Sequence, residues 1–217
     1  MKKGLTELVF ILDKSGSMSG LETDTIGGYN SMLEKQKAVD GECIITTVLF
    51  DNTYVLLHDR IDIRAVSPMT ENEYRIGGST ALLDAIGRTI HKIARAQKYT
   101  ADDYRAEKVL FVIITDGMEN ASREYSPESI RGLIDMEKTR YGWEFIFLGA
   151  NIDAVQTAGC YGISADRAVD YLADHEGTNL NFRVMSSMVT EYRQKSKISD
   201  EHLDEIRKDV RKRGAQK

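Results

Sequence analysis

Hydrophobic residues along this chain follow two patterns, which predict two kinds of secondary structure. Short uninterrupted apolar runs, typical of strands buried on both faces, occupy residues 8–12, 43–50, 109–114 and 145–148. Between these runs, apolar residues recur every three or four positions, as in 82–93, which is the spacing of one helix face. Because the two patterns alternate, the chain is predicted to form an α/β fold, with a mostly parallel sheet covered by helices on both faces.

One segment departs from this alternation and predicts an antiparallel edge strand. Asp51 and Asn52 separate two β-rich runs at 47–50 and 53–57, which indicates a hairpin with a two-residue turn. A weaker strand signal around 168–171 brings the predicted sheet to six strands.

The chain changes character after about residue 194. The segment 195–217 is strongly charged, and only Leu203, Ile206 and Val210 keep a helical spacing. We therefore predict one domain over 1–194, followed by a charged C-terminal tail with a short, loosely held helix.

Composition limits the classes of partner. The chain has 217 residues, 41% of them hydrophobic, and a formal net charge of -5, which argues against binding to nucleic acid or to an anionic membrane surface. No apolar stretch is long enough to predict a membrane-spanning helix, and no signal-type segment is apparent. Cys43 and Cys160 have no metal-ligand spacing. A reducing, cytoplasmic location with both cysteines buried is expected.

Oxygen-bearing side chains gather where the predicted strands end. Asp13, Ser15 and Ser17 follow the first strand, Asp116 follows the strand at 109–114, and Thr80 precedes the second helix. In an open parallel sheet, ligands bind beyond the carboxyl ends of the strands. The five side chains are therefore predicted to meet in one crevice.

Two carboxylates and three hydroxyls suit a hard cation. Mg²⁺ binds through one or two carboxylates and keeps some waters, whereas Zn²⁺ prefers His or Cys ligands. We therefore expect Mg²⁺ at Asp13, Ser15, Ser17, Thr80 and Asp116, with Mn²⁺ and Ca²⁺ as alternatives. The two carboxylates leave one position open for an Asp or Glu of another molecule.

At these positions the chain resembles von Willebrand factor A domains with an intact metal-ion-dependent adhesion site. That site has the pattern DxSxS, then a Thr, then an Asp in a TDG-like turn, and the resemblance extends over roughly 5–190. It implies a doubly wound, Rossmann-like three-layer fold and a non-enzymatic module that binds a protein ligand through a bridging cation. It also permits a switch in which the helix near 177–193 shifts when that ligand binds.

The loops expected to surround the site carry residues suited to a protein interface. These loops span 18–24, 67–79 and 117–127, and no more than half of their large side chains are expected to contact a ligand. The residues in question are Met18, Met69, Tyr74, Arg75, Met118, Arg123 and Tyr125. Glu119 and Glu124 lie nearby and are expected either to repel an acidic ligand or to coordinate through water.

Two other functions remain open. A phosphotransferase of the haloacid dehalogenase type would use Asp13 as its nucleophile, but such enzymes usually place a second Asp two residues later, where this chain has Ser15. Alternatively, the protein could bind a partner without metal, through its charged tail.

Overall fold

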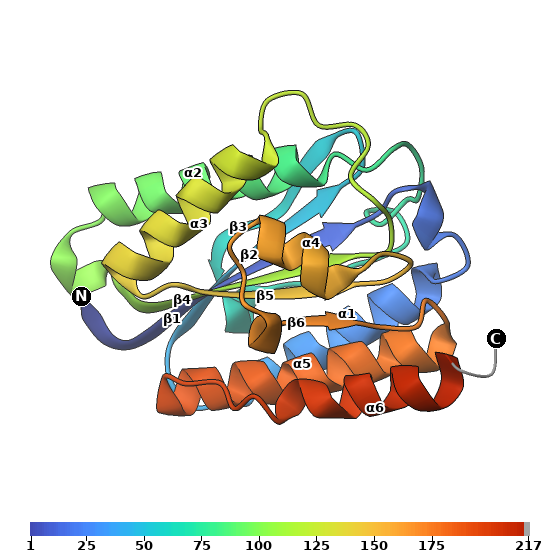
Figure 1. The fold of residues 1–217 in the computed structure, drawn as a ribbon. Helices are drawn as coiled ribbons and strands as arrows, with labels where there is room; N and C mark the ends of the chain where they lie inside the picture. The colour runs from blue at the N-terminus through green and yellow to red at the C-terminus, as the bar shows by residue number, and fades with distance from the viewer. Residues whose placement is uncertain (215–217) are drawn as a thin grey trace.

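A computed structural model of the chain, which describes residues 1–214, contains one six-stranded sheet (Figure 1). Its order is β3-β2-β1-β4-β5-β6, and every neighbouring pair is parallel except β2 with β3. The strands are β1 (Lys2–Asp13), β2 (Cys43–Phe50), β3 (Tyr54–Asp62), β4 (Ala106–Thr115), β5 (Glu144–Gly149) and β6 (Ala168–Asp170). The predicted fold class is confirmed.

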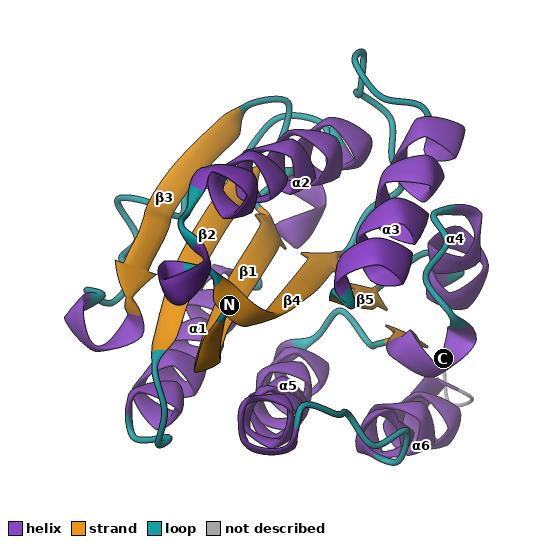
Figure 2. Cartoon of the chain, turned by 90° about the vertical axis from the view of Figure 1, so that its left-hand side faces the viewer, coloured by secondary structure: helices purple, strands orange, loops and turns teal. Residues whose placement is uncertain are grey.

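Within residues 1–214, six α-helices cover the two faces of the sheet. They are α1 (Glu22–Lys37), α2 (Leu82–Tyr99), α3 (Pro127–Tyr141), α4 (Ala154–Cys160), α5 (His175–Lys195) and α6 (His202–Gly214). Figure 2 shows α2 and α3 on one face, and α1, α5 and α6 on the other.

The uninterrupted apolar runs arise because both faces of the strands are buried. In β1, Phe10 and Leu12 pack into the core beneath α1 and α5, whereas Val9 and Ile11 pack into the core beneath α2 and α3. Every residue from Leu8 to Leu12 is at most 1% exposed. Alternate side chains thus enter two different cores, and no position of this run remains for a polar residue.

The β2–β3 hairpin has a three-residue connection rather than the predicted two-residue turn. Phe50 pairs with Tyr54 across the antiparallel ladder. The carboxylate of Asp51 accepts hydrogen bonds from both the backbone N–H and the hydroxyl of Thr53. This side chain therefore closes the turn locally.

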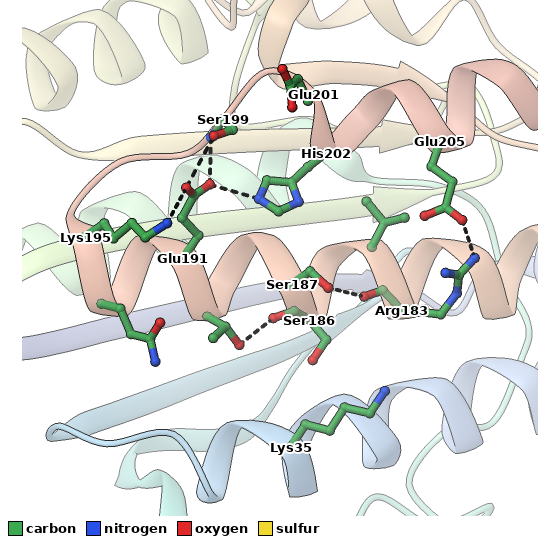
Figure 3. Close-up of a pocket in the computed structure, with 13 residues that line it drawn as sticks. Lys35, Arg183, Ser186, Ser187, Glu191, Lys195, Ser199, Glu201, His202 and Glu205 are labelled. Carbon is green, nitrogen blue, oxygen red and sulfur yellow. Dashed lines mark hydrogen bonds and ion pairs between the residues drawn. The ribbon is translucent and has the colours of Figure 1, made fainter.

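The sequence predicts a loosely held helix in the tail. Instead, helix α6 is packed against the domain. Leu203 and Ile206 are 0% and 1% exposed, within the core shared with α5. At the α5–α6 turn, Glu191 bonds Ser199 and His202 beside a pocket of about 690 Å³ (Figure 3). The boundary at residue 194 stays a prediction, and residues 215–217 of the tail lie outside the described part.

Two further features bear on the sequence predictions. Cys43 is buried, but Cys160, at the end of α4, is exposed, so the expectation that both would be buried is wrong for Cys160. Among the helices of residues 1–214, none has the length and apolarity needed to cross a bilayer.

Candidate metal centre

The sheet order brings the two predicted carboxylate segments together. β1 and β4 are parallel neighbours, with Leu12 opposite Ile114, so the loops that follow Asp13 and Thr115 leave the same edge of the sheet. Thr80 lies two residues before α2, which starts at this edge. The site thus forms at the carboxyl ends of the central strands, on the right in Figure 1.

All five predicted side chains lie in one hydrogen-bonded cluster. The Thr80 hydroxyl donates to Ser15 Oγ at 3.0 Å, and Ser15 Oγ is 3.0 Å from Ser17 Oγ. The Ser17 hydroxyl in turn donates to Asp116 Oδ1. Asp13 joins through its Oδ1, which accepts the Ser15 N–H at 2.7 Å. All of these residues are buried except Ser17, which is exposed, so the cluster faces solvent at Ser17.

A small residue is required at the centre of this cluster. A Cβ atom added to Gly117 would lie 2.9 Å from Ser17 Oγ and 3.2 Å from Thr80 Oγ1. Glycine therefore keeps open the space between the two hydroxyls and the end of β4.

No cation among residues 1–214 pairs with the two carboxylates of this cluster. Asp13 and Asp116 are each 1% exposed, and Asp116 Oδ2 is buried with no hydrogen-bond partner among the described residues. Lys14, adjacent in sequence, pairs instead with Asp51. Burial raises the pKa of Asp116 to about 6, with a further contribution from the nearby Asp13. Burial also raises the pKa of Asp13.

These observations fit a bound divalent cation. A buried carboxylate oxygen without a partner is costly unless a positive group neutralises it. Within residues 1–214, no group of three or more His, Cys, Asp or Glu side chains is arranged to hold a metal, so the donors here are mainly hydroxyls. Such a set suits Mg²⁺ or Mn²⁺ better than Zn²⁺.

Two supporting residues were not recognised as such from the sequence. The Thr115 hydroxyl donates to Asp13 Oδ2 at 2.6 Å, and the Tyr74 hydroxyl donates to the Asp13 carbonyl. Tyr74 was expected in the rim, but it is 2% exposed and lies beneath the site. The threonine of the TDG turn was a signal that could have identified Thr115; nothing in the sequence marks the role of Tyr74.

Both acidic residues of the rim are bonded within the chain. Glu119 accepts three backbone N–H groups and a serine hydroxyl, and Glu124 pairs with Arg88. Glu119 is thus held by uncharged donors of its own loop and of α2, whereas Glu124 is paired with a cation. Their effect on an acidic ligand stays a prediction. Met18 and Met69 are buried, whereas Met118 is 70% exposed.

A polar cleft lies beside the cluster. It has a volume of about 720 Å³ and is bounded by the β2–β3 turn, the start of α2 and the loop after Asp116. Ser79, Ala81 and Asn120 line it next to Thr80. None of the five candidate ligand residues lines this cleft, so it adjoins the cluster only through the neighbours of Thr80.

Comparison with solved structures identifies the fold. Over 86% of this chain and 46% of the other, the structure is similar to proximal thread matrix protein 1 from the mussel byssus, with a TM-score of 0.59 and 16% identity. A von Willebrand factor type A protein from Catenulispora acidiphila matches with a TM-score of 0.57 and 16% identity, over 85% of this chain and 42% of the other. The chain has the von Willebrand factor A fold.

Some structures with this fold are described as metal-loaded. Another structure of the mussel protein has a zinc-occupied metal-ion-dependent adhesion site, at a TM-score of 0.58 and 16% identity over 86% of this chain and 46% of the other. The manganese-loaded TRAP protein of Plasmodium vivax matches at 0.52 and 21%, over 69% of this chain and 58% of the other. The von Willebrand A fold described here thus spans about half the length of these proteins. No family model and no curated protein sequence matches the chain.

Proposed function

We propose that this protein is a non-enzymatic module that binds another protein through a divalent cation. Mg²⁺ would be held by Asp13, Ser15, Ser17, Thr80 and Asp116. When bound, the cation would balance the two carboxylates and attract an Asp or Glu of the partner to its open position. The chain's own part is to hold these oxygens in place beforehand.

One observation carries the proposal. Among the described residues, two carboxylates are buried side by side with no cation paired to them, and Asp116 Oδ2 has no hydrogen-bond partner. The zinc-occupied and manganese-loaded structures with the same fold support a cation at this position. The polar cleft beside Thr80 would accept the residues that flank the partner's carboxylate.

The experiment measures the cation first and the partner second. Titration calorimetry with Mg²⁺ and with Mn²⁺ should show one site in the wild type and none in Asp116→Ala. Asp103→Ala is the matched control, because Asp103 is an exposed carboxylate near the amino end of β4; it should bind metal as the wild type does. Wild-type protein that binds neither ion would refute the proposal.

Partner binding requires a separate test. Proteins captured from a lysate in Mg²⁺ should be lost both in EDTA and with Asp116→Ala, and capture that is equal in all three conditions would contradict a metal bridge. Deletion of 199–217 tests the alternative of metal-independent binding through the tail. Turnover of an aryl phosphate by wild type but not by Asp13→Asn would favour the phosphotransferase. The cytoplasmic location and the shift of α5 stay predictions.

A further inference from the structure

The loop after Asp116 has no regular secondary structure, yet it is attached closely to the start of α2. The carbonyl of Thr80 accepts the N–H groups of Asn120 and Ala121 at 3.0 and 3.2 Å. In return, the Thr80 N–H donates to Asn120 Oδ1 at 2.9 Å. The residue that presents one hydroxyl of the candidate centre is therefore bonded directly to the loop that follows one of its carboxylates.

Asp84, in the first turn of α2, fixes the second half of this loop. The residue is 8% exposed, and its carboxylate accepts three consecutive backbone N–H groups. Oδ1 accepts those of Glu124 and Tyr125 at 2.9 and 3.1 Å, and Oδ2 accepts that of Arg123 at 2.9 Å. A carboxylate that accepts several N–H groups holds a loop firmly, because each lost bond would leave a donor unsatisfied.

Glu119 also joins the loop to α2, but here the acceptor belongs to the loop and the donor to the helix. Its carboxylate accepts the Leu83 N–H at 2.9 Å, in addition to the N–H groups of Ala121 and Ser122. The cap residue of α2 is Ala81, which has no side chain able to bond these amides. The first turn of α2 therefore receives its caps from the loop, through Glu119 and through the Ser122 hydroxyl, which accepts the Asp84 N–H at 3.0 Å.

The contacts further along the loop are with the same helix. A Cβ atom at Gly87 would lie 2.5 Å from the ring of Tyr125, so this aromatic side chain rests directly on the helix backbone. Arg88 pairs with Glu124 at the surface. The beginning of α2 and the loop therefore form one unit, which carries Thr80 at one end and adjoins Asp116 at the other.

We propose that Asp84 and Glu119 are positioning residues, which hold Thr80 and Asp116 at the separation that the cation requires. The inference rests on the proposed function. Two buried carboxylates repel each other when no cation is present, and a loop that was free to move would let Asp116 turn away from Asp13. The reciprocal bonds oppose this movement, so the oxygens stay in place before the metal arrives.

The test compares metal affinity with fold stability in three variants. Asp84→Asn replaces one acceptor oxygen by an amide that faces a backbone N–H, and Glu119→Gln does the same at the cap. Glu124→Gln is the matched control: Glu124 lies on the same loop, and its side chain, which alone is changed, bonds the same helix only through an exposed ion pair. Mg²⁺ affinity is measured by calorimetry at a temperature at which each variant is folded by circular dichroism, and unfolding is measured in EDTA.

Loss of positioning should weaken Mg²⁺ binding about tenfold or more in Asp84→Asn and Glu119→Gln, as is usual for residues that orient metal ligands, and less than about twofold in Glu124→Gln. Lower stability in EDTA with Mg²⁺ affinity equal to that of the control would overturn the inference and leave both residues a purely structural role. If Asp84→Asn does not fold, Glu119→Gln decides. Wild-type protein that binds no metal would remove the proposed function itself, which is a different result.

Discussion

Strand β1 carries two buried carboxylates, and their surroundings are opposite. Glu7, toward the amino end, is 0% exposed; its oxygens accept Arg60 Nε at 2.7 Å and Nη2 at 3.2 Å, as well as the amide of Gln97. Asp13, at the carboxyl end, is 1% exposed and lies in a cluster with a second carboxylate, Asp116, but with no cation from the part of the chain that the structure describes. The strand, the charge and the degree of burial are the same, so only the partners differ.

This difference separates a structural group from a binding group. At Glu7 the protein supplies the opposite charge itself, and no further ligand is needed. At Asp13 and Asp116, residues 1–214 supply hydroxyls and backbone donors but no cation, and one oxygen of Asp116 has no partner among them. A buried carboxylate that is paired within the chain stabilises the fold. A buried carboxylate without a paired cation would be stabilised by binding one.

The largest expected change in the free energy of unfolding is at Glu7, the carboxylate that is paired within the chain. Arg60→Ala should lower the free energy of unfolding by about 3 kcal/mol, because it leaves a buried, uncompensated carboxylate. The loss should be equal in Mg²⁺ and in EDTA, as measured by urea unfolding. Arg64→Ala, which breaks only the exposed pair with Asp62, is the control and should cost less than about 1 kcal/mol. A loss in Arg60→Ala that disappears in Mg²⁺ would contradict the separation of the two ends.

Metal should produce the second largest change in the free energy of unfolding, and only through Asp13 and Asp116 near the carboxyl end of β1. Mg²⁺ at about 100 times its dissociation constant should raise the free energy of unfolding by about 2.7 kcal/mol. The gain should persist in Arg60→Ala and vanish in Asp116→Ala, again by urea unfolding. Stabilisation of Asp116→Ala by Mg²⁺ would show that the ion acts elsewhere.

Removal of the unpaired charge should have the smallest effect on the free energy of unfolding. Its sign should be opposite to that of Arg60→Ala. Without metal at pH 7, Asp116→Asn should raise the free energy of unfolding by about 1 kcal/mol, because it removes a buried, incompletely paired carboxylate. The pKa of Asp116 is raised from 3.8 to about 6 by folding. The folded state therefore binds the proton more tightly, and metal-free wild type should lose stability as the pH rises through about 6.

The same measurement gives its own control. Below about pH 3 the carboxyl is protonated in both states, so the advantage of Asp116→Asn should be absent there and appear between about pH 4 and 6. An advantage that does not change with pH would mean that the substitution acts through packing rather than through charge.

The sequence was a good guide where chemistry depends on local spacing. The positions of Asp13, Ser15 and Ser17 follow from one turn, and parallel strands bring their ends to one edge, so the cluster could be predicted. The role of Glu119 could not: its bond to Leu83 N joins positions 36 residues apart, and a glutamate beside a metal site equally suggests repulsion. Helix α6 was misjudged because three apolar residues among charges do not reveal that Leu203 and Ile206 enter the core beside α5.

The missing cap at Ala81 also affects the order of folding. An ordinary helix closes its first turn with a neighbouring side chain, within the time in which the helix itself forms. Here the closing groups come from beyond β4, so we expect the first turn of α2 to become complete only after β4 has joined the sheet. A contact between such distant parts of the chain forms slowly, and we therefore expect the candidate metal centre to be among the last parts of the molecule to assemble.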